Sequence, residues 1–119
     1  MAKMFLITAE ETKVVNASEL EDYYRLIGCD CIDIVARKIG NKYFEIICDD
    51  EGLLKENPRI SAVDKNMKPA LIGNLLIAGP VDEDGELTSL SDEDISIIKD
   101  NILSAIAADR LTNILKIKE

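Results

Sequence analysis

Carboxylates are the side chains in this sequence most able to do chemistry, and they occur in two clusters. The stretch from residue 69 to residue 98 has no basic residue and contains seven acids: Asp82, Glu83, Asp84, Glu86, Asp92, Glu93 and Asp94. The second cluster is the run Asp49, Asp50 and Glu51. Such a concentration of charge favours an electronegative surface that binds a basic protein surface or imitates the phosphate array of DNA. The alternative is that these acids cap turns and helices and keep the protein soluble.

The first cluster also resembles a calcium-binding loop in its spacing. Four acids fall at positions 1, 3, 5 and 12 of an EF-hand: Asp82, Asp84, Glu86 and Glu93. The sixth position needs glycine for its sharp turn, but Leu87 occupies it, and Gly79-Pro80 precludes a preceding helix. We therefore expect no EF-hand, no bound metal and no cofactor, while a weak, nonspecific divalent site stays open.

Three cysteines offer thiol chemistry: Cys29, Cys31 and Cys48. A zinc site would need a fourth ligand, and because the sequence has no histidine, a carboxylate such as Asp30 would have to serve. We favour the interpretation that Cys31 and Cys48 are small strand residues that are partly or wholly buried. An odd number of cysteines without a secretion signal indicates free thiols in a reducing cytosol.

The residue types argue against an enzyme. Without histidine there is no Ser-His-Asp or Cys-His set, and no phosphate-binding glycine motif occurs. A metal-dependent hydrolase built from carboxylates is the least favoured function, and it requires the clusters around Asp50 and Asp84 to converge in one cleft. We interpret Tyr23 and Tyr24 as helix-to-sheet packing with one exposed ring, rather than as a ligand platform.

Length and composition set the remaining limits. The 119 residues, 47% hydrophobic and 31% charged, predict a single domain over residues 1–119. The net charge of −9 argues against direct binding of nucleic acid, which needs a basic face. No apolar run approaches the roughly 20 residues that span a bilayer, so we expect no membrane contact. The first apolar run is too short for a signal peptide, which predicts a cytoplasmic protein.

The first half of the chain reads as short strands and one short helix. Residues 5–7 predict a strand, and Val14-Val15 can pair back on it. Ser18 and Glu21 form a capping-box pattern that predicts a helix over residues 18–27, and Gly28 provides its stop.

A hairpin follows, built from residues 31–37 and 42–48. A two-residue turn at Gly40-Asn41 would mix apolar and polar side chains on each face of the hairpin. We therefore predict a three-residue loop over residues 39–41, because it collects one apolar face through these pairs: Ile32 with Cys48, Ile34 with Ile46, and Ala36 with Phe44.

The second half reads as an irregular segment, a strand and a helix. Residues 53–70 are predicted irregular, and residues 71–77 are predicted to be the central strand, with a bulge at Gly73. Ser91 and Asp94 form a second capping box, and two apolar stripes predict a long helix to Asp109 or beyond. Apolar coverage on two sides of that helix predicts a homodimer through it.

Periodicity leaves residues 111–117 open between helix and edge strand. Together these elements predict an α+β fold, with a small antiparallel sheet of four to five strands and two helices, the C-terminal one long.

Several segments carry a resemblance to a known family: residues 49–54, Asn57-Pro58, residues 71–77 and residues 87–94. The chain resembles a small domain-of-unknown-function family encoded in Gram-positive gut bacteria, their phages and their conjugative elements. The family has no known activity, so the resemblance implies no catalytic residue. It does imply a mobile-element context and a cytosolic host.

The favoured function is therefore a non-enzymatic interaction protein that presents its acids to a basic protein surface, such as an inhibitor of a nucleic-acid-binding defence or replication protein. The alternative is a protein that binds or sequesters a nucleotide or other small molecule, in a pocket under residues 57–69 beside Gly73. The two hypotheses differ in what they require: charge exposed to solvent in the first, and an enclosed cavity in the second.

Overall fold

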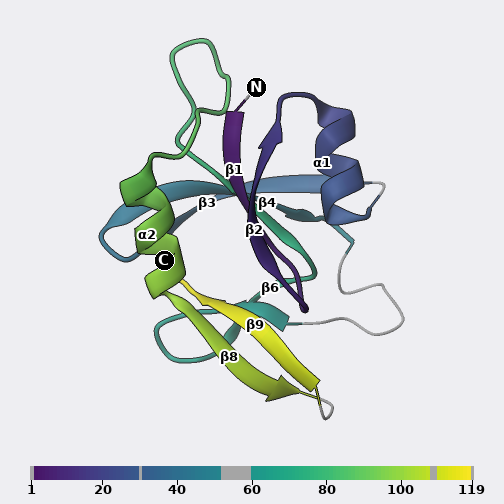
Figure 1. Ribbon diagram of the computed structural model, residues 1–119, viewed down its shortest axis with the longest axis vertical. Coiled ribbons are helices and arrows are strands. Elements are labelled where there is room, and N and C mark those ends of the chain that lie inside the picture. The colour runs from purple at the N-terminus through teal and green to yellow at the C-terminus, as the bar shows by residue number, and fades with distance from the viewer. Residues whose placement is uncertain (1, 30, 52–59, 108–109, 119) are drawn as a thin grey trace.

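The computed structural model describes residues 2–29, 31–51, 60–107 and 110–118 (Figure 1). Within these ranges the chain forms two helices, α1 (Leu20–Ile27) and α2 (Asp92–Asp100). The strands are β1 (Ala2–Ile7), β2 (Thr12–Ala17), β3 (Ile32–Ile39), β4 (Lys42–Asp49), β5 (Ile60–Val63), β6 (Pro69–Ile72), β7 (Leu75–Ala78), β8 (Ile102–Ala107) and β9 (Arg110–Lys116). The predicted α+β class with two helices is confirmed. Neither helix in the described ranges is long and apolar enough to cross a membrane.

An antiparallel five-stranded sheet has the order β2-β1-β7-β4-β3. Its central strand is β7, in which Ile77 pairs with Phe5 on one side and Ile46 on the other. All four β7 residues are buried, as expected for a strand covered on both faces. The prediction of a central strand is confirmed for Leu75–Ile77.

The residues just before β7 depart from that prediction. The chain turns at Gly73, whose φ of 82° suits glycine, so Leu71 and Ile72 belong to β6 in the other sheet. The predicted irregular segment therefore contains strands: residues 60–63 form β5, and residues 69–70 begin β6. Residues 64–68 form a turn between the two strands, as the prediction of an irregular segment requires, and residues 53–59 lie outside the described residues.

The second sheet has four strands in the order β6-β5-β9-β8, with a parallel pairing of β5 and β9. The predicted long C-terminal helix is wrong: α2 ends at Asp100, and the chain continues as the β8–β9 hairpin. The isoleucine spacing fitted a helix, but alternation and β-branched residues suit strands equally well, and pairing between β8 and β9 decided the outcome. Residues 111–116 thus lie in an interior strand. The argument for a homodimer assumed a long C-terminal helix with two apolar sides, and the chain has no such helix among the described residues.

Hydrophobic cores cover both faces of the five-stranded sheet. The larger core joins one face to α2 and the second sheet, and includes Phe5, Ile46, Ile77, Ile98 and Leu115. The smaller core joins the other face to α1, and includes Met4, Leu6, Ala17, Ile27, Ile47 and Leu76. β1, β4 and β7 contribute apolar side chains to both cores. The surface segments, including the loop between β7 and α2, therefore connect to strands that are packed on both faces.

The β3–β4 hairpin has a register that differs from the prediction. Ile39 pairs with Lys42 across a two-residue turn, Gly40-Asn41, and Ala36 pairs with Glu45. Gly40 has a φ of 62° at the first turn position, as a type II′ turn requires. The three-residue loop is wrong because it assumed one apolar face, whereas β4 is buried on both.

Helix α1 ends as predicted but begins later. Gly28 adopts the left-handed conformation at the C-terminal end, with a φ of 80°. At the other end, Asp22 Oδ2 accepts the backbone N–H groups of Ser18 and Glu19, at 3.1 Å and 3.2 Å. The predicted Ser18–Glu21 capping pair is therefore wrong by one residue, because β2 continues through the buried Ala17 and keeps the chain extended to Ser18.

Candidate interaction surface

The segment between β7 and α2 carries four of the seven clustered acids, and it forms an ordered hairpin, which we call the acidic hairpin (residues 79–90). Its arms are joined by the hydrogen bond from Gly79 N–H to the Thr88 carbonyl, at 2.9 Å, and by a β-bridge between Val81 and Leu87. The acidic hairpin projects from the end of the sheet where the chain begins (Figure 1, top). Its acids are therefore held in place by backbone pairing.

The tip of the acidic hairpin is organised by one of its own carboxylates. Asp82 Oδ1 accepts the backbone N–H groups of Asp84 and Glu86, both at 2.9 Å. Gly85 completes the turn with a φ of 80°. One oxygen of Asp82 is thus used in folding, while Glu83 and Asp84 are exposed and make none of the tip hydrogen bonds through their carboxylates.

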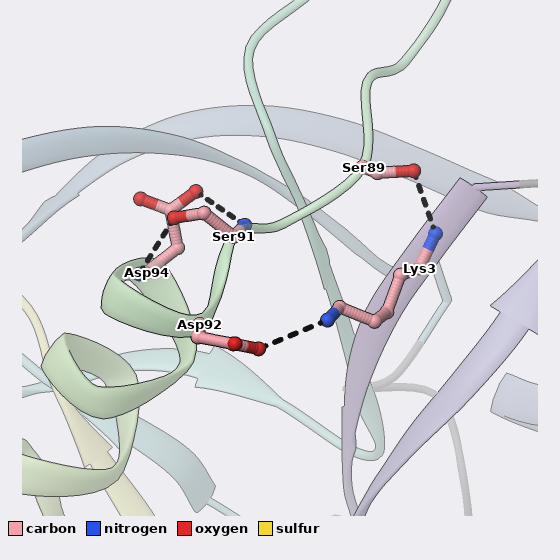
Figure 2. Close-up of polar contacts among 5 residues, drawn as sticks. All are labelled: Lys3, Ser89, Ser91, Asp92 and Asp94. Carbon is pink, nitrogen blue, oxygen red and sulfur yellow. Dashed lines mark hydrogen bonds and ion pairs between the residues drawn. The ribbon is translucent and has the colours of Figure 1, made fainter.

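The base of the acidic hairpin is fixed to β1 by Lys3 (Figure 2). The Lys3 backbone N–H donates to Ser89 Oγ at 3.0 Å, and its carbonyl accepts the Leu90 N–H at 2.8 Å. Gly79 packs so closely here that an added Cβ would lie 2.5 Å from Thr88 Oγ1. The Lys3 ammonium turns toward α2 and pairs with Asp92 Oδ1 at 3.2 Å.

The acids at the start of α2 are used differently from those of the hairpin. Asp94 is only 4% exposed, so it does not lie on the predicted acidic surface. Its Oδ2 accepts the Ser91 N–H at 2.9 Å, and its own N–H donates to Ser91 Oγ at 3.1 Å, which confirms the predicted capping box. Its Oδ1 pairs with the ammonium of Lys42.

These contacts also explain the acidity of Asp94. Burial by itself would raise the pKa of this carboxyl, but the hydrogen bonds from Lys42 and Ser91 outweigh burial and hold the pKa below its ordinary value. Asp94 is therefore ionised at neutral pH, and its charge is compensated by Lys42. Of the three acids at this helix start, Asp92 is paired with Lys3 and Glu93 is exposed.

The second acidic cluster lies away from the hairpin. Asp49 is at the end of β4, where its Cβ lies 3.9 Å from the position of a Cβ on Gly73, just before β7 begins. Its Oδ1 accepts the Glu51 N–H at 2.9 Å, and Asp50 and Glu51 are exposed. Because the hairpin follows the other end of β7, the two clusters lie at opposite ends of that strand. The hydrolase hypothesis needed the Asp50 and Asp84 clusters to converge, and they do not.

The cysteines proposed as possible metal ligands are also separated in the structure. Cys29 and Cys48 are both buried, but they belong to the cores on opposite faces of the sheet. The prediction of burial holds for Cys48 and is wrong for Cys31, which is exposed. Burial raises the pKa of the Cys48 thiol to about 11, helped by the nearby Asp33 carboxylate. No group of three or more His, Cys, Asp or Glu side chains among the described residues could hold a metal ion.

A recess of about 350 Å³ opens at the foot of the acidic hairpin, between it, α1 and the paired ends of β1 and β2. It is lined by Ala2, Ala17, Ser18, Tyr23, Asp82, Glu86, Leu87, Thr88 and Ser89. Sequence reasoning placed a pocket under residues 57–69 instead, and part of that segment lies outside the described residues. The recess joins three stretches that are distant in sequence, namely residue 2, residues 17–23 and residues 82–89, and its only local signal was the aromatic pair in α1.

Tyr23 links the recess to the core. Tyr23 and Tyr24 are both partly buried against the smaller core, which confirms the predicted helix-to-sheet packing but leaves neither ring fully exposed. Burial, with the nearby carboxylates of Glu86 and Asp22, raises the pKa of the Tyr23 phenol. Tyr23 therefore keeps its proton at neutral pH and stays a hydrogen-bond donor.

Comparison with known families gives one match. The model of the family described as "Domain of unknown function (DUF3846)" matches residues 2–103. The chain belongs to the DUF3846 family. The match runs from β1 into β8, so it includes the acidic hairpin and every residue that lines the recess. No curated protein and no solved structure matches this DUF3846 chain.

Proposed function

We propose that this DUF3846 protein is a non-enzymatic interaction protein that binds a basic protein surface through its acidic hairpin. The observation that carries the proposal is an ordered projection whose exposed acids, Glu83 and Asp84, are held at a tip built by Asp82. A rigid hairpin loses little conformational entropy on binding, so its charges are available at low cost. The net charge of −9 would also speed the approach of a basic partner.

The charge of the hairpin is also not compensated locally. In the described part of the chain, ion pairs involve Asp92, Asp94, Asp22 and Glu11, and none involves an acid of the hairpin. The seven acids of residues 69–98 therefore contribute unequally to the surface field: the four hairpin acids and Glu93 face solvent without an ion pair among the described residues, whereas Asp92 and Asp94 are paired. Nucleic acid is disfavoured as a direct ligand, because its phosphates would approach these carboxylates.

The resemblance noted in the sequence adds a cellular setting to the proposal. It suggests a cytoplasmic protein of a phage or conjugative element in Gram-positive gut bacteria. In that setting, a basic partner would be a nucleic-acid-binding defence or replication protein of the host, and the acidic hairpin would occupy the surface that normally contacts DNA or RNA phosphates. This setting rests on family association and not on contacts in the structure.

Small-molecule binding is the second candidate, and the recess favours it. The carboxylates of Asp82 and Glu86 would repel nucleotide phosphates, so the ligands that suit the recess are cationic or neutral. A thermal-shift screen separates the candidates, because a ligand that binds the folded state raises the melting temperature. A rise with a neutral small molecule would favour small-molecule binding over the interaction function.

The direct test compares two double variants that each remove two carboxylate charges. The probe is a fluorescein-labelled peptide of alternating arginine and glycine, titrated with the full chain at low and at high salt. Glu83→Gln/Asp84→Asn should weaken binding roughly tenfold at low salt, since close charge pairs across an interface are strongly coupled. Asp50→Asn/Glu51→Gln, at the far end of β7, should leave binding nearly unchanged. Binding that is absent or indifferent to salt would contradict the proposal.

A further inference from the structure

The recess at the foot of the acidic hairpin has three chemically different walls. Its hairpin side is lined by the acidic residues Asp82 and Glu86, and its α1 side by Tyr23, whose phenol lies close enough to Glu86 to feel its charge. Its apolar lining comes from three small or aliphatic residues on the β1–β2 end and the hairpin: Ala2, Ala17 and Leu87. This combination of acceptors, aromatic ring and apolar surface matches a side chain with a cationic head and an aliphatic stem.

Among the described residues, no cationic side chain lines the recess. The nearest basic residue in sequence is Lys3, whose ammonium is committed to Asp92 on the α2 side. Because side chains alternate along a strand, Ala2 faces the recess while Lys3 points away from it. Within the described residues, neither Asp82 nor Glu86 has an ion-pair partner within 4.0 Å.

The walls of the recess are also well supported. Ala17 is fully buried and Leu87 packs against the smaller core, so the apolar lining is continuous with the core beneath α1. The carboxylate of Asp82 is held by the two N–H groups of the hairpin tip. The raised pKa of Tyr23 keeps its phenol protonated beside Glu86, so it adds a neutral donor and a ring but no third negative charge.

We propose that the recess is a subsite for one arginine side chain of the basic partner, and this proposal rests on the proposed function. The volume of about 350 Å³ lies at the low end of the roughly 300–1,000 Å³ usual for small-ligand pockets, which suits a single side chain. The guanidinium fits better than a lysine ammonium because it can meet two carboxylates as a planar fork and stack on a tyrosine ring. Its stem would lie along the apolar lining.

The test uses three peptides that differ at one position. Each has glycine and serine residues around a single arginine, lysine or citrulline, and binding is followed by fluorescence anisotropy with the full chain. We expect arginine to bind tightest, lysine more weakly, and citrulline, which keeps the shape but loses the charge, at least roughly tenfold more weakly than arginine. Equal binding of arginine and citrulline would overturn the subsite.

Variants locate the binding in the recess. Ser18 is exposed and lines the recess, so Ser18→Tyr should plug it without changing charge and abolish the preference for arginine. Ser96→Tyr is the matched control, since Ser96 is exposed on α2 and is not a lining residue. If the Ser18→Tyr variant does not fold, Glu86→Gln replaces it in the test, because it keeps the side-chain size and removes one charge. Glu86→Gln should reduce the preference for arginine severalfold.

The outcomes separate this proposal from the proposed function. If the arginine–glycine peptide binds in a salt-dependent way and responds to Glu83→Gln/Asp84→Asn, but Ser18→Tyr and Glu86→Gln have no effect, the subsite is wrong and the interaction function stands. If that peptide does not bind, the interaction function is wrong. Titration with N-acetylarginine methylamide then decides the recess alone: amide NMR shifts at Tyr23 and Leu87 support the subsite, and their absence overturns it.

Discussion

The tripeptide Asp-Glu-Asp occurs twice in this chain, at residues 82–84 and 92–94, and the two copies have different roles. In the second copy, Asp94 is buried, caps α2 and pairs with Lys42, while Asp92 pairs with Lys3. In the first copy, Asp82 shapes the turn, and the two acids that follow it are exposed. Identical local sequence thus gives a helix start in which two of three acids are ion-paired, with only Asp94 buried, and a projecting tip in which no acid has an ion pair among the described residues.

The neighbours of each copy cause this difference. Helix α2 lies against the β3–β4 turn, which brings Lys42 to Asp94, and against β1, which brings Lys3 to Asp92. The acidic hairpin projects beyond the sheet, where the described chain places no cation within ion-pair distance of its acids. A count of acids in sequence therefore overstates the surface field, because part of the charge is used to hold the fold together.

The largest expected difference between the copies is in stability. Asp94→Ala should lower the free energy of unfolding by about 2 kcal/mol, because it removes a helix cap and leaves Lys42 without its partner. The partial exposure of Lys42, at 46% of its side chain, keeps the loss below that of a fully buried ion pair. Asp84→Ala should change stability by less than about 0.5 kcal/mol. Urea denaturation measures both, and equal losses would mean that the two copies are not distinct.

The pH dependence should follow the same contrast. Since the pKa of Asp94 is lower in the folded state than in the unfolded state, its contribution is present above the unfolded pKa of about 4 and is lost as pH falls through the folded value. We expect the wild type to lose more stability than Asp94→Asn as pH falls below about 4. Asp22 and Asp64, whose pKa values are also lowered, remain in both proteins and cancel in the difference. Parallel curves from thermal unfolding would contradict the assignment.

A smaller effect is expected from two glycines that have positive φ in the two regions. At Gly40, under α2, an added Cβ would lie 2.9 Å from Ile97 Cγ2, whereas at Gly85, in the hairpin tip, nothing lies within 4 Å. Gly85→Ala should cost about 1 kcal/mol of stability from backbone strain alone. Gly40→Ala should cost more, about 2 kcal/mol, because Ile97 must also move. Chemical denaturation measures both losses of stability. A larger loss for Gly85→Ala than for Gly40→Ala would contradict the closer packing at Gly40.

Local signals in the sequence predicted the elements that depend on local chemistry. The Ser91–Asp94 capping box, the Gly28 stop and the pairing of residues 5–7 with Val14-Val15, which the structure extends to residues 2–7 and 12–17, follow from caps, glycine conformation and short apolar runs. The central strand was visible for the same reason, since β7 is apolar without interruption.

Features set by distant contacts were not predictable in this way. The register at Gly40-Asn41 depends on β4 being buried on both faces, and the end of α2 at Asp100 depends on β8 finding β9. Of the candidate acids, the sequence identified the cluster but could not show that Asp94 is buried. The recess depends on the approach of β1, β2, α1 and the hairpin, so the aromatic pair in α1 could not by itself reveal it.

The most direct test of this account is the affinity for the arginine–glycine peptide of two variants, one in each copy of the tripeptide. Glu83→Gln/Asp84→Asn and Asp92→Asn/Glu93→Gln each remove two charges from the net −9 and make the same conservative changes. The account predicts a loss of roughly tenfold for the hairpin variant at low salt and less than about twofold for the helix variant. Equal losses would show that only total charge matters, and would contradict the claim that the hairpin is the binding element.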